Sequence, residues 1–238
     1  MSQSASSNRL RRAIRDNDLL WTKRLVHKVD SVENYDAEEE GMSSLHLAAL
    51  LGHQHIVAFL VQIGHDRREI SRNGRLETPI MLAAKHDREQ TVHFLALQFP
   101  RSVDMRNDRQ QTPLIVASRA GNDAVCNILL DFGARVDAAE MNGDTALHHA
   151  SAWGHLQVLR SLLLRGAAFD KENRAGFTAA AYSYTSTCNT YFVSMVADVE
   201  KQRLKTRPMN RLRSNTGPTE PHAVERRIPN YKPRTNEQ

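Results

Sequence analysis

Cysteine is scarce in this sequence, and long apolar runs are absent. The 238 residues include two cysteines, Cys126 and Cys188, which are too few and too far apart for a disulfide scaffold or a zinc site. We expect both to be buried thiols in a reducing cytosol or nucleus. No run approaches the roughly eighteen apolar residues of a membrane span, so no transmembrane segment is predicted. Residues 1–12 are serine-rich and then basic with no apolar stretch behind them, so we expect no secretory signal.

The sequence also lacks the residue patterns of a catalytic site or a cofactor site. No nucleophile, base and orienting residue recur together, and no glycine-rich phosphate loop appears. We therefore expect no enzyme activity, no cofactor and no small-molecule substrate. Eleven histidines invite a metal hypothesis, but His53 and His55 are poorly spaced for joint ligation, and no cysteine or carboxylate completes a set. His149 adjoins His148 but points to another side of a helix, so no metal site is predicted.

Positive charge is concentrated near the C-terminal end of the sequence. The chain has a formal net charge of +5. Residues 201–238 hold ten Lys/Arg against three Glu, a net of +7, so the preceding 200 residues sum to −2. A nearly neutral body argues against a protein that grips nucleic acid along its length, and no specific nucleic-acid partner is expected.

What the sequence does contain is one short pattern repeated four times. It starts at residues 43, 78, 112 and 145, at spacings of 35, 34 and 33 residues, and reads SSLHLA, TPIMLA, TPLIVA and TALHHA. A fixed period in this range that carries Thr-Pro-Leu-His-x-Ala resembles the ankyrin repeat. The resemblance implies a stack of repeats that binds other proteins and is rarely an enzyme. It also implies that the motif histidines, His46 and His148, bond to the backbone of a turn.

Each repeat contains the signals for two helices and a sharp reversal. Thr78 and Thr112 are suited to cap a helix whose first residue is the following proline. Four residues after the motif alanine stands a glycine, or Asp87 in one repeat, where the chain must turn sharply. Apolar residues at helical spacing follow. Turn sequences such as Asn73-Gly74 then lead to the next repeat, and we predict that they project from the stack as fingertips.

The predicted fold class is all-α, an ankyrin-repeat solenoid of paired antiparallel helices with projecting turns and a disordered C-terminal tail. Four full repeats are expected between degenerate capping repeats, within a domain at residues 8–202, and residues 1–7 are predicted to be disordered. The domain should close with a helix that carries Tyr191, Phe192, Met195 and Val196 on one side.

Residues 203–238 change character. They contain five prolines and few apolar residues, so they cannot bury enough surface to offset their ordering entropy, and a basic disordered tail is predicted. Within this tail, Arg211-Leu212-Arg213-Ser214 fits a basophilic kinase site, which makes Ser214 a candidate phosphorylation site. Such matches are common by chance in basic segments.

Charged residues on successive fingertips are the candidate partner-binding residues. An acidic run lies in the first interrepeat loop, and arginines follow on the next two fingertips. Because adjacent tips of a solenoid are neighbours in space, positive charge should accumulate along one edge. The alternative for both groups is a set of solvated side chains without a partner. The candidates are Asp36, Glu38, Glu39, Glu40, Arg67, Arg68, Arg72, Arg75, Arg106 and Arg109.

Two irregular segments resemble a narrower family. Residues 60–66 (LVQIGHD) and residues 88–95 (REQTVHFL) with 98–101 (QFPR) are similar to the fungal ankyrin-repeat subunits of target-of-rapamycin complex 2. His65-Asp66 and Phe99-Pro100 each stand where Gly-Ala is commoner. The resemblance implies a non-catalytic scaffold or regulatory subunit of that kinase assembly, cytoplasmic and peripheral at the plasma membrane, with the other subunits as partners. The alternative is a free-standing ankyrin adaptor or assembly chaperone with a proteasomal or transcriptional partner.

Overall fold

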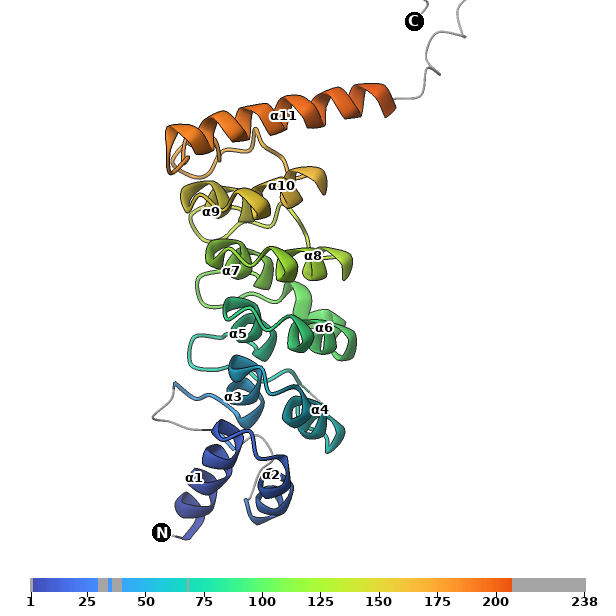
Figure 1. Cartoon of the computed structure of the whole chain (residues 1–238). Helices are drawn as coiled ribbons and strands as arrows, with labels where there is room; N and C mark the ends of the chain where they lie inside the picture. Colours follow the sequence, from blue (N-terminus) through green and yellow to red (C-terminus); the bar gives the residue numbers. More distant parts are fainter. Residues whose placement is uncertain (1, 30–33, 36–39, 68, 207–238) are drawn as a thin grey trace, which may run out of the picture.

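A single row of helix pairs makes up the structure, a computed structural model that describes residues 2–29, 34–35, 40–67 and 69–206 (Figure 1). The first helices of the pairs lie along one side of the row and the second helices along the other. The pair α1–α2 lies at one end, and α11 crosses the other end. Apart from two isolated β-bridges in turns, the regular structure of the described residues is helical, which confirms the predicted all-α solenoid.

Each pair consists of two helices joined by a tight turn. The first helices are α1 (Ser2–Arg15), α3 (Ser44–Leu51), α5 (Pro79–Lys85), α7 (Pro113–Ala120) and α9 (Ala146–Ala152). The second helices are α2 (Leu19–Leu25), α4 (Gln54–Gln62), α6 (Glu89–Gln98), α8 (Asp123–Asp131) and α10 (Leu156–Leu164). The 3-10 turns η1 (Val26–Lys28) and η2 (Pro100–Asp104) follow α2 and α6, and α11 (Ser186–Thr206) comes after the last pair.

The start of a first helix depends on the residue before it. The hydroxyls of Ser43 and Thr112 accept a hydrogen bond from the backbone N–H three residues later, at 3.3 and 3.4 Å. The sequence predicts the same cap at Thr78, but that hydroxyl makes no capping bond and is buried with no hydrogen-bond partner among the described residues. Pro79 already has the φ angle of the first helical residue, so α5 forms without this side-chain cap.

Left-handed backbone reverses the chain after each first helix. Gly52, Gly121 and Gly154 have φ angles of 79°, 83° and 70° at this point. Asn17 and Asp87 hold the same place in their repeats, with φ angles of 55° and 57°. Because Asn and Asp tolerate this region better than other residues with a side chain, the same reversal occurs in every pair.

The hydrophobic core runs without a break through the row. The motif alanines are fully buried between neighbouring first helices, where a small side chain lets two backbones approach closely; they are Ala48, Ala83, Ala117 and Ala150. Leu129 on α8 and Leu162 on α10 are 0% exposed between the second helices. Each repeat therefore buries its apolar face against its neighbours.

The two cysteines are free and buried in this core, as predicted. Burial raises the pKa of the Cys126 thiol to about 12. The thiol therefore stays protonated at neutral pH and packs as a small apolar group.

Helical structure extends past both predicted boundaries of the domain. The sequence predicts disorder for residues 1–7, but α1 begins at Ser2. Leu10 and Ile14 anchor this helix in the core, and once a helix is nucleated its extension costs little. At the other end, α11 continues through Thr206, where the sequence places the start of the tail at residue 203.

The closing helix α11 packs across α9 and α10. Its buried residues, Cys188, Phe192 and Val199, recur at helical spacing. The partly buried residues beside them, Tyr191, Met195 and Val196, confirm the predicted closing helix. Residues 207–238, which hold most of the predicted tail, lie outside the described residues. Among the described helices, none combines the length and the apolar character that a membrane crossing requires.

Candidate partner-binding surface

The fingertips, which lead from one repeat to the next and centre on residues 40, 75, 109, 142 and 175, form one continuous edge. A backbone hydrogen bond of 2.6 to 3.1 Å ties each tip to the one before it. These bonds run from Gly74 to the Glu40 carbonyl, from Asp108 to Arg75, from Met141 to Arg109 and from Arg174 to Asn142. The edge is therefore held in register along its length.

A buried asparagine shapes three of these tips. The side-chain carbonyl of Asn73 accepts hydrogen bonds from the backbone N–H groups of Arg75 and Glu77, at 3.0 and 2.9 Å. Asn107 and Asn173 do the same in their own tips. Because the backbone of each tip is fixed in this way, its outward side chains are presented in a defined arrangement.

Some predicted binding residues are already paired within the molecule. Arg75 Nη2 lies 2.5 Å from Glu40 Oε1 on the adjacent tip, and both side chains are about half exposed. Such an exposed pair contributes little to stability, but it neutralises both charges locally. Arg106 is half-buried, and its guanidinium donates a hydrogen bond to the Ala139 carbonyl in the next tip at 2.9 Å. Arg75 and Arg106 therefore join tips to one another.

Arg67, Arg72 and Arg109 are the predicted residues that stay available to a partner. All three are exposed. Within the described residues, their side chains make no hydrogen bond or ion pair. Exposed arginines are frequent anchors at protein interfaces, so these three remain candidates for partner binding, and the positive edge stays a prediction.

Several predicted residues lie outside the described part of the chain. They are Asp36, Glu38, Glu39 and Arg68 among the partner-binding candidates, and Ser214 as the phosphorylation candidate. Their roles stay predictions.

The motif histidines hold two of the first helices, α3 and α9, to the fingertip that follows. His46 Nε2 lies 2.9 Å from the carbonyl oxygen of Glu77, and His148 Nε2 lies 3.1 Å from that of Phe177. In both rings Nδ1 faces the hydroxyl three residues earlier, at 2.7 and 2.9 Å. Nε2 therefore donates to the turn and Nδ1 accepts, which confirms the predicted bond to turn backbone. Burial lowers the pKa of His46 to about 4, so this ring is neutral at neutral pH.

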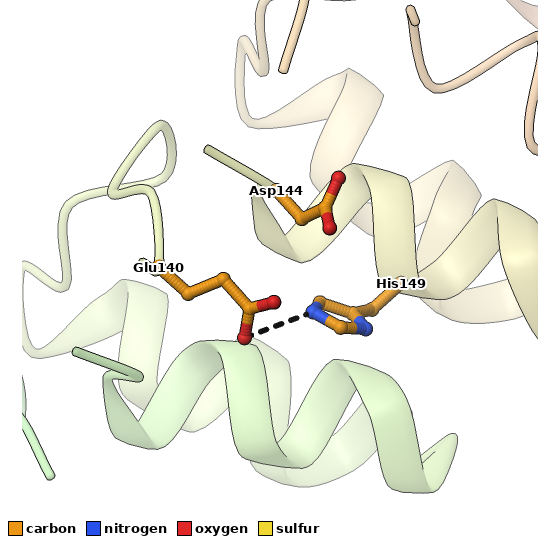
Figure 2. A group of neighbouring side chains, drawn as sticks. All are labelled: Glu140, Asp144 and His149. Atoms are coloured by element: carbon orange, nitrogen blue, oxygen red, sulfur yellow. Dashed lines mark ion pairs between the residues drawn. The ribbon is translucent and has the colours of Figure 1, made fainter. Parts of the chain in front are cut away.

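A polar cluster lies at the fingertip before α9. Figure 2 shows Glu140 and Asp144 beside His149, which comes from α9. Glu140 Oε2 is 3.4 Å from His149 Nε2, and one ligand atom from each residue lies within 4.8 Å of the others. Glu140 also accepts a hydrogen bond from the Gln111 amide at 2.5 Å. Asp144 accepts one from Asn173 at 2.7 Å.

The bonds made by this cluster indicate a bridge between tips. Gln111, Glu140 and Asn173 belong to three successive tips, so the two carboxylates link neighbours along the edge. Burial lowers the pKa of His149, which therefore tends to be neutral beside Glu140. The set has the groups of a cation site, but both carboxylates already accept from amides, and the predicted lack of a metal site stays a prediction. Sequence reasoning missed the cluster because a turn, rather than a regular spacing, brings its members together.

The repeated motifs, helix pairs and tips match those of a known protein family. A model of ankyrin repeats, in three copies, matches residues 10–105 and again residues 81–174. The chain belongs to the ankyrin-repeat family. Ankyrin repeats provide protein–protein interaction surfaces, and that the fingertip edge is such a surface in this chain stays a prediction.

Individual relatives contain the ankyrin stack within longer chains. The chain is 35% identical over 161 residues to the target of rapamycin complex 2 subunit AVO2 of Saccharomyces cerevisiae, which covers 67% of this chain and 38% of that protein. It is 26% identical over 169 residues to the palmitoyltransferase AKR1 of Lachancea kluyveri, covering 71% of this chain and 23% of that one. It is 27% identical over 165 residues to synphilin-1 of Mus musculus, covering 66% and 17%.

The His65-Asp66 pair replaces an ordinary ankyrin turn with a buried polar network. Both side chains are buried, and His65 Nδ1 lies 2.7 Å from Asp66 Oδ1. The other carboxylate oxygen accepts a hydrogen bond from the Ser71 hydroxyl at 3.0 Å. Ser71 in turn lies 3.3 Å from the hydroxyl of Ser43, the cap of α3. The pair therefore connects the end of one ankyrin repeat to the start of its own first helix.

Exposed aromatic residues gather near the end of the ankyrin stack that α11 closes. Tyr182 packs edge-on against His148 and Phe177, with ring centroids 5.9 Å apart in both pairs. Trp153 and Tyr184 are also exposed. These residues were not among the predicted binding residues, although the break in the motif at residues 179–185 marks the region in the sequence.

Proposed function

We propose that this chain is a non-catalytic scaffold or regulatory subunit of a target-of-rapamycin complex 2 kinase assembly. In this role it is cytoplasmic and stays at the periphery of the plasma membrane through the complex. The observation that carries the proposal is the 35% identity to AVO2 over 161 residues. This chain spans about two fifths of the length of AVO2, so its membership of such a complex is an inference from the shared ankyrin stack.

The geometry supports a docking role. Backbone bonds hold successive tips in register, and Arg72 and Arg109 are exposed on these tips. A rigid surface loses little conformational entropy on binding, which favours affinity without new contacts. The exposed arginines would set the register and the association rate more than the final affinity.

A free-standing adaptor or assembly chaperone is the second candidate. The observation that favours it is the similarity of the same stack to segments of AKR1 and synphilin-1, whose names describe a palmitoyltransferase and a protein of a different kind. An ankyrin stack is used in many protein contexts, so the stack alone does not select the partner. A proteasomal or transcriptional partner would fit this alternative.

Affinity purification of the tagged chain at its natural level, followed by mass spectrometry, separates the two candidates. We expect the kinase subunit of target-of-rapamycin complex 2 to co-purify in amounts comparable to the chain. An unrelated ankyrin stack with the same tag is the control for non-specific capture. Recovery of a proteasomal or transcriptional partner without the kinase would contradict the proposal and support the adaptor.

A further inference from the structure

The first 200 residues are nearly neutral as a whole, but positive and negative charge are separated along the stack. Residues 2–29 contain seven Lys/Arg against two Asp, a net of +5. Residues 30–200 contain fifteen Lys/Arg against twenty-two Asp/Glu, a net of −7. The pair α1–α2 is therefore a basic end on an acidic stack, and Figure 1 places this pair at the end of the row opposite α11.

Three basic residues of this end line a hollow of about 550 Å³ between α1 and the segment from α2 to η1. Arg9 and Arg12 line it from α1, and Lys28 lines it from η1. The side chain of Trp21 forms part of its wall. All four residues are exposed, so cationic groups and an indole meet on one open surface.

Two large apolar residues at the start of α2 are exposed beside these cations. Leu20 is 71% exposed and Trp21 is 53% exposed. The guanidinium of Arg24 lies 5.7 Å from the centre of the Trp21 ring, a distance that fits a cation–π contact. No described element covers either residue. Solvent exposure of such apolar surface is unfavourable, which favours burial against a partner.

We infer that this basic end binds the surface of an anionic lipid bilayer. Basic residues near a membrane are drawn to anionic headgroups, and indole rings prefer the boundary between headgroups and acyl chains. Leu20 and Trp21 supply the groups that would enter that boundary. The acidic repeats beyond are repelled by the same lipids, so the stack stands end-on to the membrane.

The composition of the hollow favours a surface over a single bound anion. Asp16 and Asp18 also line it, and their carboxylates would repel a phosphate placed within it. A bilayer responds to the summed charge of the whole end, which stays strongly positive. An acidic polypeptide would pair with the basic side chains. It would not explain why the apolar Leu20 is exposed next to Trp21.

Vesicle binding by the purified full chain tests the inference without the proposed complex, so the two can fail separately. The vesicles contain phosphatidylcholine with about 30% phosphatidylserine, and pure phosphatidylcholine vesicles are the control. We expect sedimentation with the anionic vesicles only. Replacement of Arg9, Arg12 and Lys28 by Gln should weaken binding by about 100-fold, because each basic residue near an anionic surface contributes roughly fivefold.

A matched variant distinguishes this end from the basic residues of the tail. Arg211→Gln, Arg213→Gln and Arg227→Gln remove the same charge and should lower binding by less than fivefold. A Trp153→Phe background leaves Trp21 as the single tryptophan. Its emission should shift to shorter wavelength with anionic vesicles and not with neutral ones. Absence of binding, a larger loss in the tail variant, or no Trp21 shift would each overturn the inference.

Discussion

The two ends of the stack differ in how the outer face of the terminal repeat is covered. A repeat buries its apolar faces against its neighbours, so the outer face of the last repeat at each end lacks a partner. At one end α11 lies over α9 and α10 and buries Phe192. At the other end the outer surface of α1–α2 carries Arg9 and Arg12 and leaves Trp21 exposed.

This difference separates stability from recognition. Burial of a large apolar side chain contributes much to the free energy of unfolding, whereas an exposed side chain contributes little. Residues of the α11 end should therefore matter for stability. Residues of the α1–α2 end should matter for what the protein contacts.

The sharpest comparison is between the aromatic residues of the two ends. Phe192→Ala should lower the free energy of unfolding by about 3–5 kcal/mol, because it leaves a cavity beneath α11. Trp21→Ala should change it by less than about 1 kcal/mol, because the indole is half exposed. Urea unfolding followed by circular dichroism measures both. Equal losses would show that the two ends are held in the same way.

Leucines within one helix test the same contrast in the middle of the stack. Leu162→Ala should cost about 2–5 kcal/mol, as should Leu129→Ala, because both side chains lie in the continuous core. Leu164 lies on the same helix as Leu162 and is 52% exposed, so Leu164→Ala is the matched control with a loss below about 1 kcal/mol. Thermal melts that show Leu162→Ala unchanged would mean that the repeat register is wrong.

Acid should weaken the repeat next to the basic end. Burial lowers the pKa of His46 to about 4 from an ordinary value of 6.5, so the unfolded chain binds the proton more readily than the folded one. Stability is fully present above about pH 6.5 and falls as pH drops toward 4, by about 2 kcal/mol at pH 5.

The control for this pH effect removes the titrating group. A His46→Gln variant will be less stable at pH 7, because it loses the bond to the Glu77 carbonyl. Its unfolding free energy should nevertheless depend less on pH between 7 and 5. If wild type and variant show the same dependence in urea titrations, the loss arises from other groups.

The smallest expected effects concern the fingertip backbone. Gly143 has a φ of 86°, and a Cβ there would lie 2.8 Å from the backbone nitrogen of Arg174, so Gly143→Ala should cost about 1–2 kcal/mol. Leu76 holds the equivalent place two residues before the motif, with a φ of 57°. Leu76→Gly removes this strain and should be neutral or stabilising by up to about 1 kcal/mol. We expect the melting temperature to fall for Gly143→Ala only, and an equal fall in both variants would contradict this prediction.

The regular part of the fold could be predicted because its signals are local. A motif alanine, a capping hydroxyl or a left-handed glycine acts within a few residues, so the period in the sequence is also the period in space. Thr78 shows the limit, because the cap suggested by its type is not formed. The starts and ends of α1 and α11 depend on packing against neighbours, which no local pattern records.

The candidate surface was less predictable for a related reason. The arginines of the tips could be placed on one edge from the period alone. The period does not predict that Arg75 pairs with Glu40 or that Arg106 bonds to a carbonyl. These pairings depend on the geometry between neighbouring tips. The basic end escaped notice because the charges of residues 2–29 and 30–200 nearly cancel in one sum.

Partner recovery with charge-reversed tips tests most directly the claim that the fingertip edge is the docking surface. Arg72→Glu with Arg109→Glu alters two exposed tip arginines, and Arg101→Glu with Arg160→Glu makes the same charge change on the side of the second helices. Both variants should keep the wild-type melting temperature. We predict that partner recovery in affinity purification falls at least about tenfold for the tip variant and stays near wild type for the other. Equal recovery with both variants would contradict the account.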